Sequence, residues 1–413
     1  MRIDEESAGT VLSRLDEDPV VPSTVDIVRA VTDGRRRRRN RRLAGYAAVA
    51  GGTAVMLVGA SAVAGTLRGP AASAPGSAGS ATASVEVAPP GPTSCAIKQL
   101  PLPDGRKMAL VTGGDPVGRF LLGRTYPDHS SGGSMGLHVV IWDRLRPTVV
   151  AVPGDDQSLQ DVNSHGVAVG SGWGQSGTVA YYYRDGKVAK LPGGDGADAK
   201  AINDAGSVVG ERGQKPVVWR SVDQAPVDLA LPSGAASGAA VDIDEDGTVI
   251  GAVGADLTNQ RPYVWSRDGS GHYLVIPSGV PPVPAKSGAT KAGAVNTSVP
   301  SANVRNIRNG WVTGRVNATP VRWNLRTGDI RQFPEFGGFA DGINRYGWQI
   351  GLDTQSRARL VADAAPVVLP ELAKHRAGSL SNIPTTISDD GKLIGGQSDD
   401  GNDVIHAVMW TCS

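Results

Sequence analysis

Residues suited to metal binding or redox chemistry are scarce in this sequence. Its 413 residues include two cysteines, six histidines and four phenylalanines. No two histidines stand at a His-x-x-x-His spacing, and no spare cysteine could join them in a zinc or copper site. A phosphate-binding Gly-Lys-Ser/Thr loop is also missing. We therefore expect a protein without catalytic residues, a cofactor or a transition-metal centre.

Amphipathic helical runs are likewise missing beyond residue 100, whereas the chain has 55 glycines and 28 prolines. This composition is typical of many short strands joined by tight turns. The formal net charge of +1 gives no general attraction to nucleic acid, so we expect no nucleic-acid partner. Charge is nevertheless uneven, because acidic residues predominate over residues 1–34 and a run of arginines fills most of residues 35–42.

An uncharged segment follows these arginines. From Leu43 to Leu67 the chain carries no charge, and as a helix this segment would be roughly 37 Å long, enough to cross a bilayer. Arginines on its N-terminal side favour a cytoplasmic N-terminus. We predict a cytoplasmic segment over residues 1–42, with a short helix through Val31, and a transmembrane helix over residues 43–67. A cleaved signal peptide is the alternative, because Ala60-Ser61-Ala62 has the small-x-small pattern of a cleavage site.

The next segment, residues 68–94, consists mostly of Ala, Ser, Gly and Pro. It has too little large apolar surface to offset the entropy cost of ordering, so we predict a disordered tether. The remaining residues, 95–413, then form one extracytoplasmic domain attached to the cell membrane by a single pass.

A short phrase recurs along this last domain: a polar turn, Gly, three mostly apolar residues, and Gly again. Each copy is followed by a segment that usually ends in an aromatic residue and then by a segment that usually ends in Pro. Periods of roughly 40–50 residues with four strands per unit are typical of propellers. The copies are Gly118–Gly123, Gly166–Gly170, Gly206–Gly210, Gly247–Gly251, Gly310–Gly314, Gly347–Gly351 and Gly391–Gly395.

The third copy illustrates the predicted unit of four strands. They cover residues 199–202, 207–211, 216–220 and 226–231, and Asn203-Asp204-Ala205-Gly206 forms the first turn. In that turn Asn can bond to its own downstream backbone and Gly can take positive φ. We therefore predict an all-β, seven-bladed β-propeller with four-stranded blades.

The seventh copy lacks a fourth strand, because the sequence stops at Ser413. Residues 98–101 read as an orphan fourth strand, and we predict that this N-terminal strand closes the ring by completing the last blade. Cys95 precedes the orphan strand and Cys412 follows the last aromatic residue, so on neighbouring antiparallel strands their Cα atoms could lie near 5.5 Å. We predict a structural disulfide, with two free thiols as the alternative.

The segment Ile405-His406-Ala407-Val408-Met409-Trp410 resembles the His-Ala-Phe-Leu-Trp phrase of the HAF-type extracellular repeats. The stretch from Ala201 to Gly210 is similar to that family's other signature. Such repeats are associated with secreted or surface proteins of bacteria, and the resemblance implies no catalytic residue. The N-terminal part also resembles actinobacterial membrane proteins, some of them linked to sigma-factor regulation.

One acidic turn is a weak candidate for a metal site. Asp242, Asp244 and Asp246 alternate before Gly247 and could supply oxygen ligands to Ca²⁺. An ordinary hairpin is the stronger interpretation, since the same turn position carries Asn203 or Asn344 in other copies.

The tryptophans fall into two groups. Those that recur at one position of the repeat are expected to pack between blades rather than to stack against sugars. Trp173, Trp311 and Trp348 break the pattern, so we predict that they belong to an exposed ligand surface. The recurring group comprises Trp142, Trp219, Trp265, Trp323 and Trp410.

These observations favour a membrane-anchored, non-enzymatic binding or scaffold module for an envelope or extracellular ligand, either protein or glycan. Two alternatives stay open. The protein could be a membrane sensor whose cytoplasmic residues 1–34 dock a regulator such as a sigma factor. It could also be a propeller hydrolase or lyase, which would need acid and base groups clustered at the channel mouth.

Overall fold

The computed structural model describes residues 88–413, apart from 104–105, 127–136, 176, 258, 278–300, 338, 363–364, 377–380 and 403. The predicted cytoplasmic segment, the transmembrane helix and residues 68–87 of the predicted tether lie outside the described residues. Within the described part, no helix has the length and apolar character that a membrane crossing requires.

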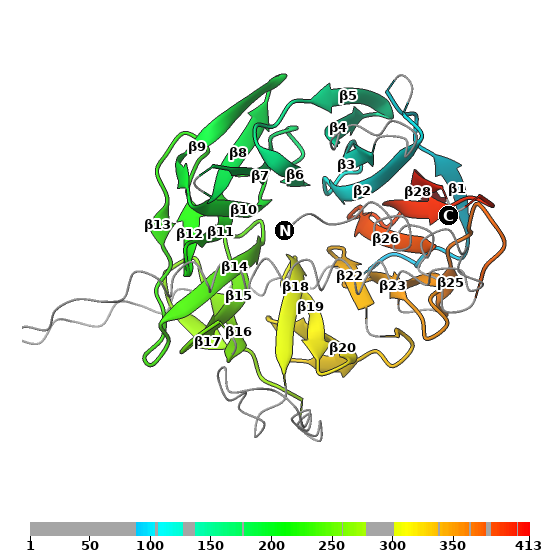
Figure 1. Cartoon of the computed structure of the whole chain (residues 1–413). Helices are drawn as coiled ribbons and strands as arrows, with labels where there is room; N and C mark the ends of the chain where they lie inside the picture. The colour runs from blue at the N-terminus through cyan, green and yellow to red at the C-terminus, as the bar shows by residue number, and fades with distance from the viewer. Residues whose placement is uncertain are drawn as a thin grey trace, which may run out of the picture. The chain divides into compact units, whose positions relative to one another are not determined.

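Seven antiparallel sheets, each of four strands, surround a central axis (Figure 1). This arrangement confirms the predicted seven-bladed propeller. We number the blades in chain order from the first complete sheet. Blade 1 contains β2 (Met108–Gly114), β3 (Phe120–Tyr126), β4 (His138–Asp143) and β5 (Arg146–Val150). Blade 2 contains β6 (Asp155–Val162), β7 (Ala168–Gly174), β8 (Gly177–Arg184) and β9 (Lys187–Asp195). Blade 3 contains β10 (Ala197–Ile202), β11 (Val208–Arg212), β12 (Lys215–Trp219) and β13 (Val227–Asp228).

The remaining blades follow the same order, with the first strand of each nearest the axis. The outer strands vary in length, from two residues in β13 and β25 to nine in β9. Blade 4 contains β14 (Ser237–Ile243), β15 (Val249–Gly254), β16 (Gln260–Trp265) and β17 (Gly271–Tyr273). Blade 5 contains β18 (Ala302–Arg308), β19 (Trp311–Val316), β20 (Thr319–Asn324) and β21 (Ile330–Gln332). Blade 6 contains β22 (Phe339–Ile343), β23 (Gln349–Leu352), β24 (Ala358–Val361) and β25 (Val367–Val368). Blade 7 contains β26 (Asn382–Ile387), β27 (Leu393–Asp399), β28 (Ile405–Cys412) and β1 (Cys95–Gln99).

The two glycines of the repeated phrase have different structural roles. The first takes positive φ in all seven blades, for example +80° at Gly206, as the turn prediction requires. The second lies opposite a β-bulge in the innermost strand, where a Cβ on Gly210 would be 2.0 Å from the Asp198 carbonyl oxygen. In blade 7 this second position is Gly396 rather than the predicted Gly395, because Gly396 is the residue that pairs with Pro384 at the bulge.

Tryptophan links most blades to the blade before them. Each recurring Trp is at most 2% exposed, which confirms that it packs in the core. Its indole Nε1 donates a hydrogen bond to a backbone carbonyl of the preceding blade, either that of the Pro in or after its outer strand or that of the residue two positions before this Pro. The bonds are Trp142 to Pro101 (2.7 Å), Trp219 to Pro192 (2.9 Å), Trp265 to Ala230 (2.7 Å), Trp323 to Val275 (2.8 Å) and Trp410 to Pro370 (2.8 Å).

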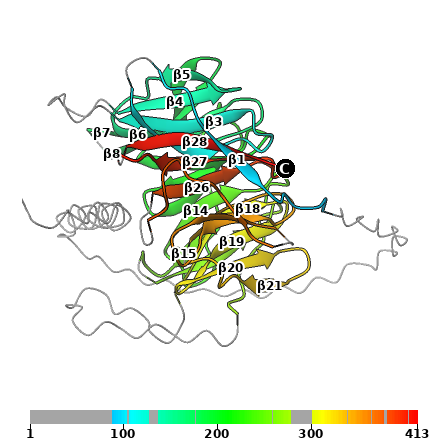
Figure 2. The same ribbon diagram turned by 90° about the vertical axis from the view of Figure 1, so that its right-hand side faces the viewer.

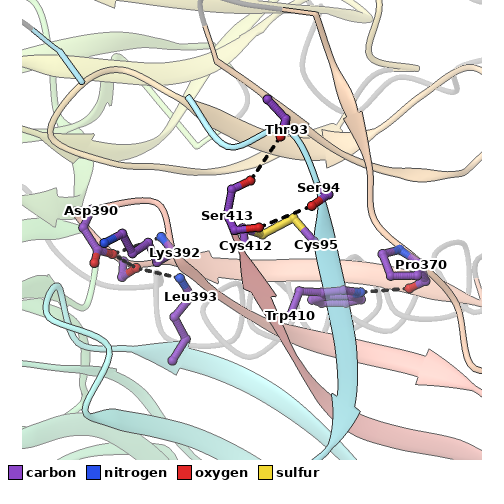
Figure 3. Close-up of a disulfide and its surroundings, with 11 residues drawn as sticks. Thr93, Ser94, Cys95, Pro370, Asp390, Lys392, Leu393, Trp410, Cys412 and Ser413 are labelled. Carbon is purple, nitrogen blue, oxygen red and sulfur yellow. Dashed lines mark hydrogen bonds between the residues drawn. A yellow bond between two sulfur atoms is a disulfide. The ribbon is translucent and has the colours of Figure 1, made fainter. Parts of the chain in front are cut away.

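Strand β1 lies beside β28, so blade 7 contains strands from both ends of the propeller sequence (Figure 2). Cys95 and Cys412 stand directly opposite each other and form a disulfide (Figure 3). Their Cα atoms are 4.0 Å apart, closer than the 5.5 Å expected from sequence. The reason is register: Ser94 and Ser413 exchange both backbone hydrogen bonds, so the cysteines occupy the adjacent, narrower non-hydrogen-bonded pair.

Reduction of the disulfide should lower the melting temperature. The cross-link joins residues 317 apart in sequence, so loop-closure entropy gives an upper limit of ~5 kcal/mol for its stabilisation. Thermal unfolding monitored by circular dichroism, with and without reductant, measures the effect. The variant C412S should not respond to reductant, and an equal response in both proteins would contradict a stabilising role.

The tryptophan hydrogen bonds are tested by comparing W219F with W348F. Both indoles are buried, but Nε1 of Trp348 has no hydrogen-bond partner, whereas Nε1 of Trp219 bonds to the Pro192 carbonyl. W219F leaves that carbonyl unpaired and should lower the free energy of unfolding by about 1–3 kcal/mol more than W348F. Denaturant titration of the two variants provides the measurement. Equal losses would mean that the bond contributes nothing beyond ring packing.

Candidate functional site

A cavity of about 160 Å³ lies on the propeller axis, and residues of all seven blades line it. These residues belong to the ends of the innermost strands and to the turns that follow them. Four carboxyl groups face two basic groups, Lys200 and Arg308, and no histidine is among the described lining residues. We call Asp161, Asp242, Glu245, Arg308 and Asp389 the channel-mouth site. The structure therefore gathers the carboxyl groups that a catalytic propeller would need, but without a histidine.

Arg308 connects three blades at this site. Its Nε and Nη2 donate to the two carboxylate oxygens of Asp389 in blade 7 at 2.9 and 2.6 Å. Its Nη1 donates to Glu245 in blade 4 at 2.5 Å. Burial alone would lower the pKa of Arg308, but the bonds to Asp389 and Glu245 outweigh it and raise that pKa. Arg308 thus remains charged and is neutralised inside the protein, which leaves it little capacity to bind an added anion.

Arg308 occupies a position where other blades carry a small polar residue. In blades 2, 3 and 6 that residue is Asn163, Asn203 or Asn344. Its Oδ1 accepts amide hydrogens of its own turn, and its Nδ2 donates to a carbonyl of the next blade at 3.1 Å. An arginine side chain has no hydrogen-bond acceptor, so Arg308 cannot accept the amide hydrogens of its own turn.

Blade 5 has no Asn side chain to accept the amide hydrogens of its turn, and Asp244 of blade 4 accepts them instead. Its carboxylate accepts the backbone N–H groups of Asn309 at 2.8 Å and Gly310 at 2.7 Å. Asn309 in turn donates from Nδ2 to the Arg345 carbonyl at 2.9 Å, so the contact to blade 6 is kept. Because the turn is stabilised from the preceding blade, the side chain of Arg308 can extend towards Asp389.

Asp161 and Asp242 stand at equivalent places in blades 2 and 4. Each accepts the amide of the residue after it and, from the next blade in the chain, the amide of Ile202 (2.8 Å) or Ile307 (2.7 Å). Burial raises the pKa of Asp161 to about 7, although its two backbone hydrogen bonds act in the opposite direction. Burial, and then the charge of Asp161, also raise the pKa of Asp242 well above its usual range. The site can therefore take up a proton near neutral pH.

The calcium candidate does not assemble into a metal site. Asp242 and Asp244 use their oxygens on backbone amides of blades 4 and 5, and the exposed Asp246 accepts the amide of Thr248 at 2.8 Å. Across the part of the chain that the structure describes, no group of three or more His, Cys, Asp or Glu residues is arranged to hold a metal ion. The geometry is that of an ordinary hairpin turn.

The three unusual tryptophans do not share one surface character. Trp173 is 42% exposed, as predicted for a ligand surface. Trp311 is partly buried, with the Arg322 guanidinium 4.4 Å from its ring centroid. The prediction for Trp348 is wrong, because this side chain is 1% exposed and lies in the core shared by blades 6 and 7. Its ring packs over Gly391, where a Cβ would lie 2.4 Å away.

Sequence reasoning missed Asp161, Arg308 and Asp389, which lie far apart in the chain. A signal was present in the repeat itself. Asp161 and Asp242 each precede the turn residue by two positions, where blade 3 has Ala201, and the turn of blade 5 is one residue shorter than that of blade 3. Comparing the copies position by position would have marked these departures.

The raised pKa of Asp161 predicts a pH-dependent stability. Since its folded pKa of about 7 exceeds the ordinary aspartate pKa of 3.8, the folded protein holds a proton that the unfolded chain releases. Its contribution is complete below about pH 4 and is lost as pH rises to about 7 and above. Between about pH 4 and 7, the free energy of unfolding should therefore fall less steeply with pH in D161N than in the wild type, by up to ~1.4 kcal/mol per pH unit. Part of the pH dependence should remain, because Asp242 also has a raised pKa. Denaturant titrations at several pH values, with D246N as an exposed control, test this; an unchanged slope in D161N would refute it.

No family model and no curated protein matches the sequence. Solved structures that resemble the chain include Raptor of Chaetomium thermophilum, at 10% identity and a TM-score of 0.41, covering 75% of this chain and 29% of that chain. Acylaminoacyl peptidase of Pyrococcus horikoshii has 9% identity and a TM-score of 0.46, covering 74% of this chain and 52% of that chain. A prolyl endopeptidase structure gives 9% identity and a TM-score of 0.46, covering 74% and 50%. The chain spans less than two thirds of the length of each of these proteins, and no activity transfers at this level of similarity.

Proposed function

We propose that the protein is a membrane-anchored binding or scaffold module whose propeller lies outside the cytoplasm. Residues 1–42 would be cytoplasmic, residues 43–67 would cross the membrane, and residues 68–94 would tether the propeller to it. The observation that carries this proposal is the disulfide between Cys95 and Cys412, since such bonds persist in oxidising compartments and are rare in the cytosol. It agrees with the orientation that the arginine run favours.

The state of the channel-mouth site supports binding rather than catalysis. Arg308 is held by Asp389 and Glu245, and the carboxylates of Asp161 and Asp242 accept backbone amides from neighbouring blades. Polar groups committed to such bonds hold the blades together. Ligand contacts are then made by the outer loops and by exposed side chains such as Trp173, and the ligand would be a protein or glycan of the envelope or the extracellular space. The resemblance to HAF-type extracellular repeats points the same way.

A propeller hydrolase or lyase is the second candidate. The observation in its favour is that Asp161 and Asp242 line one cavity and both have a raised pKa, as general acids often do. In that case D161N and D242N would abolish turnover while the protein stays folded.

The location is tested on intact cells that carry the full-length protein with an N-terminal tag. Added protease should degrade the propeller but spare the tag until the cells are lysed. A membrane-impermeant thiol reagent should not label the native protein and should label it after reduction. A propeller that is protected in intact cells, or free thiols in the native protein, would exclude the proposed topology.

The binding role is tested in the same preparation by sedimentation with isolated cell envelopes. The detergent-solubilised protein should be retained saturably, without release of soluble envelope fragments, and D161N should bind as the wild type does. Release of fragments that D161N abolishes would instead establish the enzymatic alternative.

A further inference from the structure

At every boundary between blades, the second strands contribute two residues at equivalent positions, and at six boundaries these two residues pack together. In the first blade it is the residue just before the second glycine of the repeated Gly-x-x-x-Gly phrase. In the next blade it is the residue two positions before the corresponding glycine. Val209 and Val249, for example, belong to one buried cluster. Six boundaries carry residues without polar side chains at both places: Leu122 and Ala168, Val169 and Val208, Val209 and Val249, Ile250 and Val312, Ile350 and Ile394, and Gly395 and Leu121.

The boundary between blades 5 and 6 is different, because the two residues are Thr313 and Gln349. Both are fully buried. The Thr313 hydroxyl and both polar atoms of the Gln349 amide have no hydrogen-bond partner in the protein. Buried polar groups in folded proteins are almost always paired, with protein or with ordered water. This boundary therefore leaves three buried polar atoms unpaired at positions that carry no polar side chain at the other six boundaries.

Strand geometry places both side chains in the same interface. Trp311 and Thr313 lie two residues apart on β19 and so share a face, and the ring of Trp311 packs over Gly347 of blade 6, where a Cβ would be 2.8 Å away. Gln349 lies two residues beyond Gly347 and directly opposite Val361. Val361 in turn belongs to a buried cluster with Phe333 of blade 5.

The same boundary lacks the tryptophan hydrogen bond. Val361 stands where five other blades carry the recurring Trp and blade 2 carries Tyr183, and Arg322 of blade 5 bridges the boundary instead. Its Nη1 donates to the Gly347 carbonyl, and its guanidinium lies 4.4 Å from the ring centroid of Trp311 and 5.1 Å from that of Phe333. Thr313 is the direct cross-strand partner of Arg322, so these two polar side chains lie on the same face of blade 5.

We propose that Thr313, Gln349 and Arg322 form a hydrated seam, a site for buried water at which the ring opens before any other boundary. Water suits these groups, because it can donate to the Gln349 amide oxygen and accept from the amide nitrogen and the Thr313 hydroxyl. An interface with exchangeable water between its second strands separates more readily than one in which valine and isoleucine fill these positions. Arg308 and Asp389 tie blade 5 to blade 7 at the channel mouth, so the ring stays connected while the seam opens.

The seam is tested by the rate at which a buried thiol is modified in the native protein. Both native cysteines are in the disulfide, so a single introduced cysteine reports alone. T313C places the thiol in the seam, and V209C places it at the equivalent, fully buried position between blades 3 and 4. Under native conditions a small thiol reagent should modify T313C at least tenfold faster than V209C. Adding Q349L to T313C should slow the reaction towards the rate of V209C.

Equal rates for T313C and V209C, or a rate that Q349L leaves unchanged, would overturn the proposal. Native-state hydrogen exchange of the unmodified protein gives an answer that does not depend on variants. As denaturant is added below the unfolding transition, amides of β19 and β23 should lose protection before those of β11 and β15. Simultaneous loss in all four strands would also overturn it.

Discussion

Each blade depends on its neighbours, because a four-stranded sheet has two apolar faces and cannot bury either of them alone. The buried clusters reflect this, since most of them combine residues of two successive blades rather than of one. The glycines follow from the same constraint. One permits the turn that returns the chain along the sheet, and the other lets the bulged inner strand approach closely, so the blades taper towards the axis.

Much of this architecture could be predicted because it repeats. A turn such as Asn203–Gly206 carries its own signal, and seven copies in register give the number of blades. Local chemistry also places the recurring tryptophans in the core. Trp348 could not be assigned in this way, since its burial depends on contacts with blade 7 that no local pattern records. Gly396 was missed because adjacent glycines make the repeat ambiguous by one residue, and only the strand register decides between them.

The channel-mouth site was beyond local reasoning for a similar reason. Asp161, Asp242, Arg308 and Asp389 come from four blades, and only closure of the ring brings them together. The sequence does show the positions where one copy of the repeat departs from the others.

Several of these positions lie in blade 5 or at its boundary with blade 6. They are Arg308 in place of a residue that accepts the turn amides, the polar pair Thr313 and Gln349, and Val361 in place of Trp. Positions where one copy departs from the others are the positions at which a function beyond the fold is most expected.

The position of the disulfide has a mechanical consequence for a tethered propeller. Under the proposed anchoring, tension between the membrane and a bound ligand would enter the domain over residues 91–94, just before Cys95. The load would pass through the covalent bond directly into β28, in the interior of blade 7, and would not peel β1 from the sheet one hydrogen bond at a time. The strand that closes the ring would then bear little of the pull.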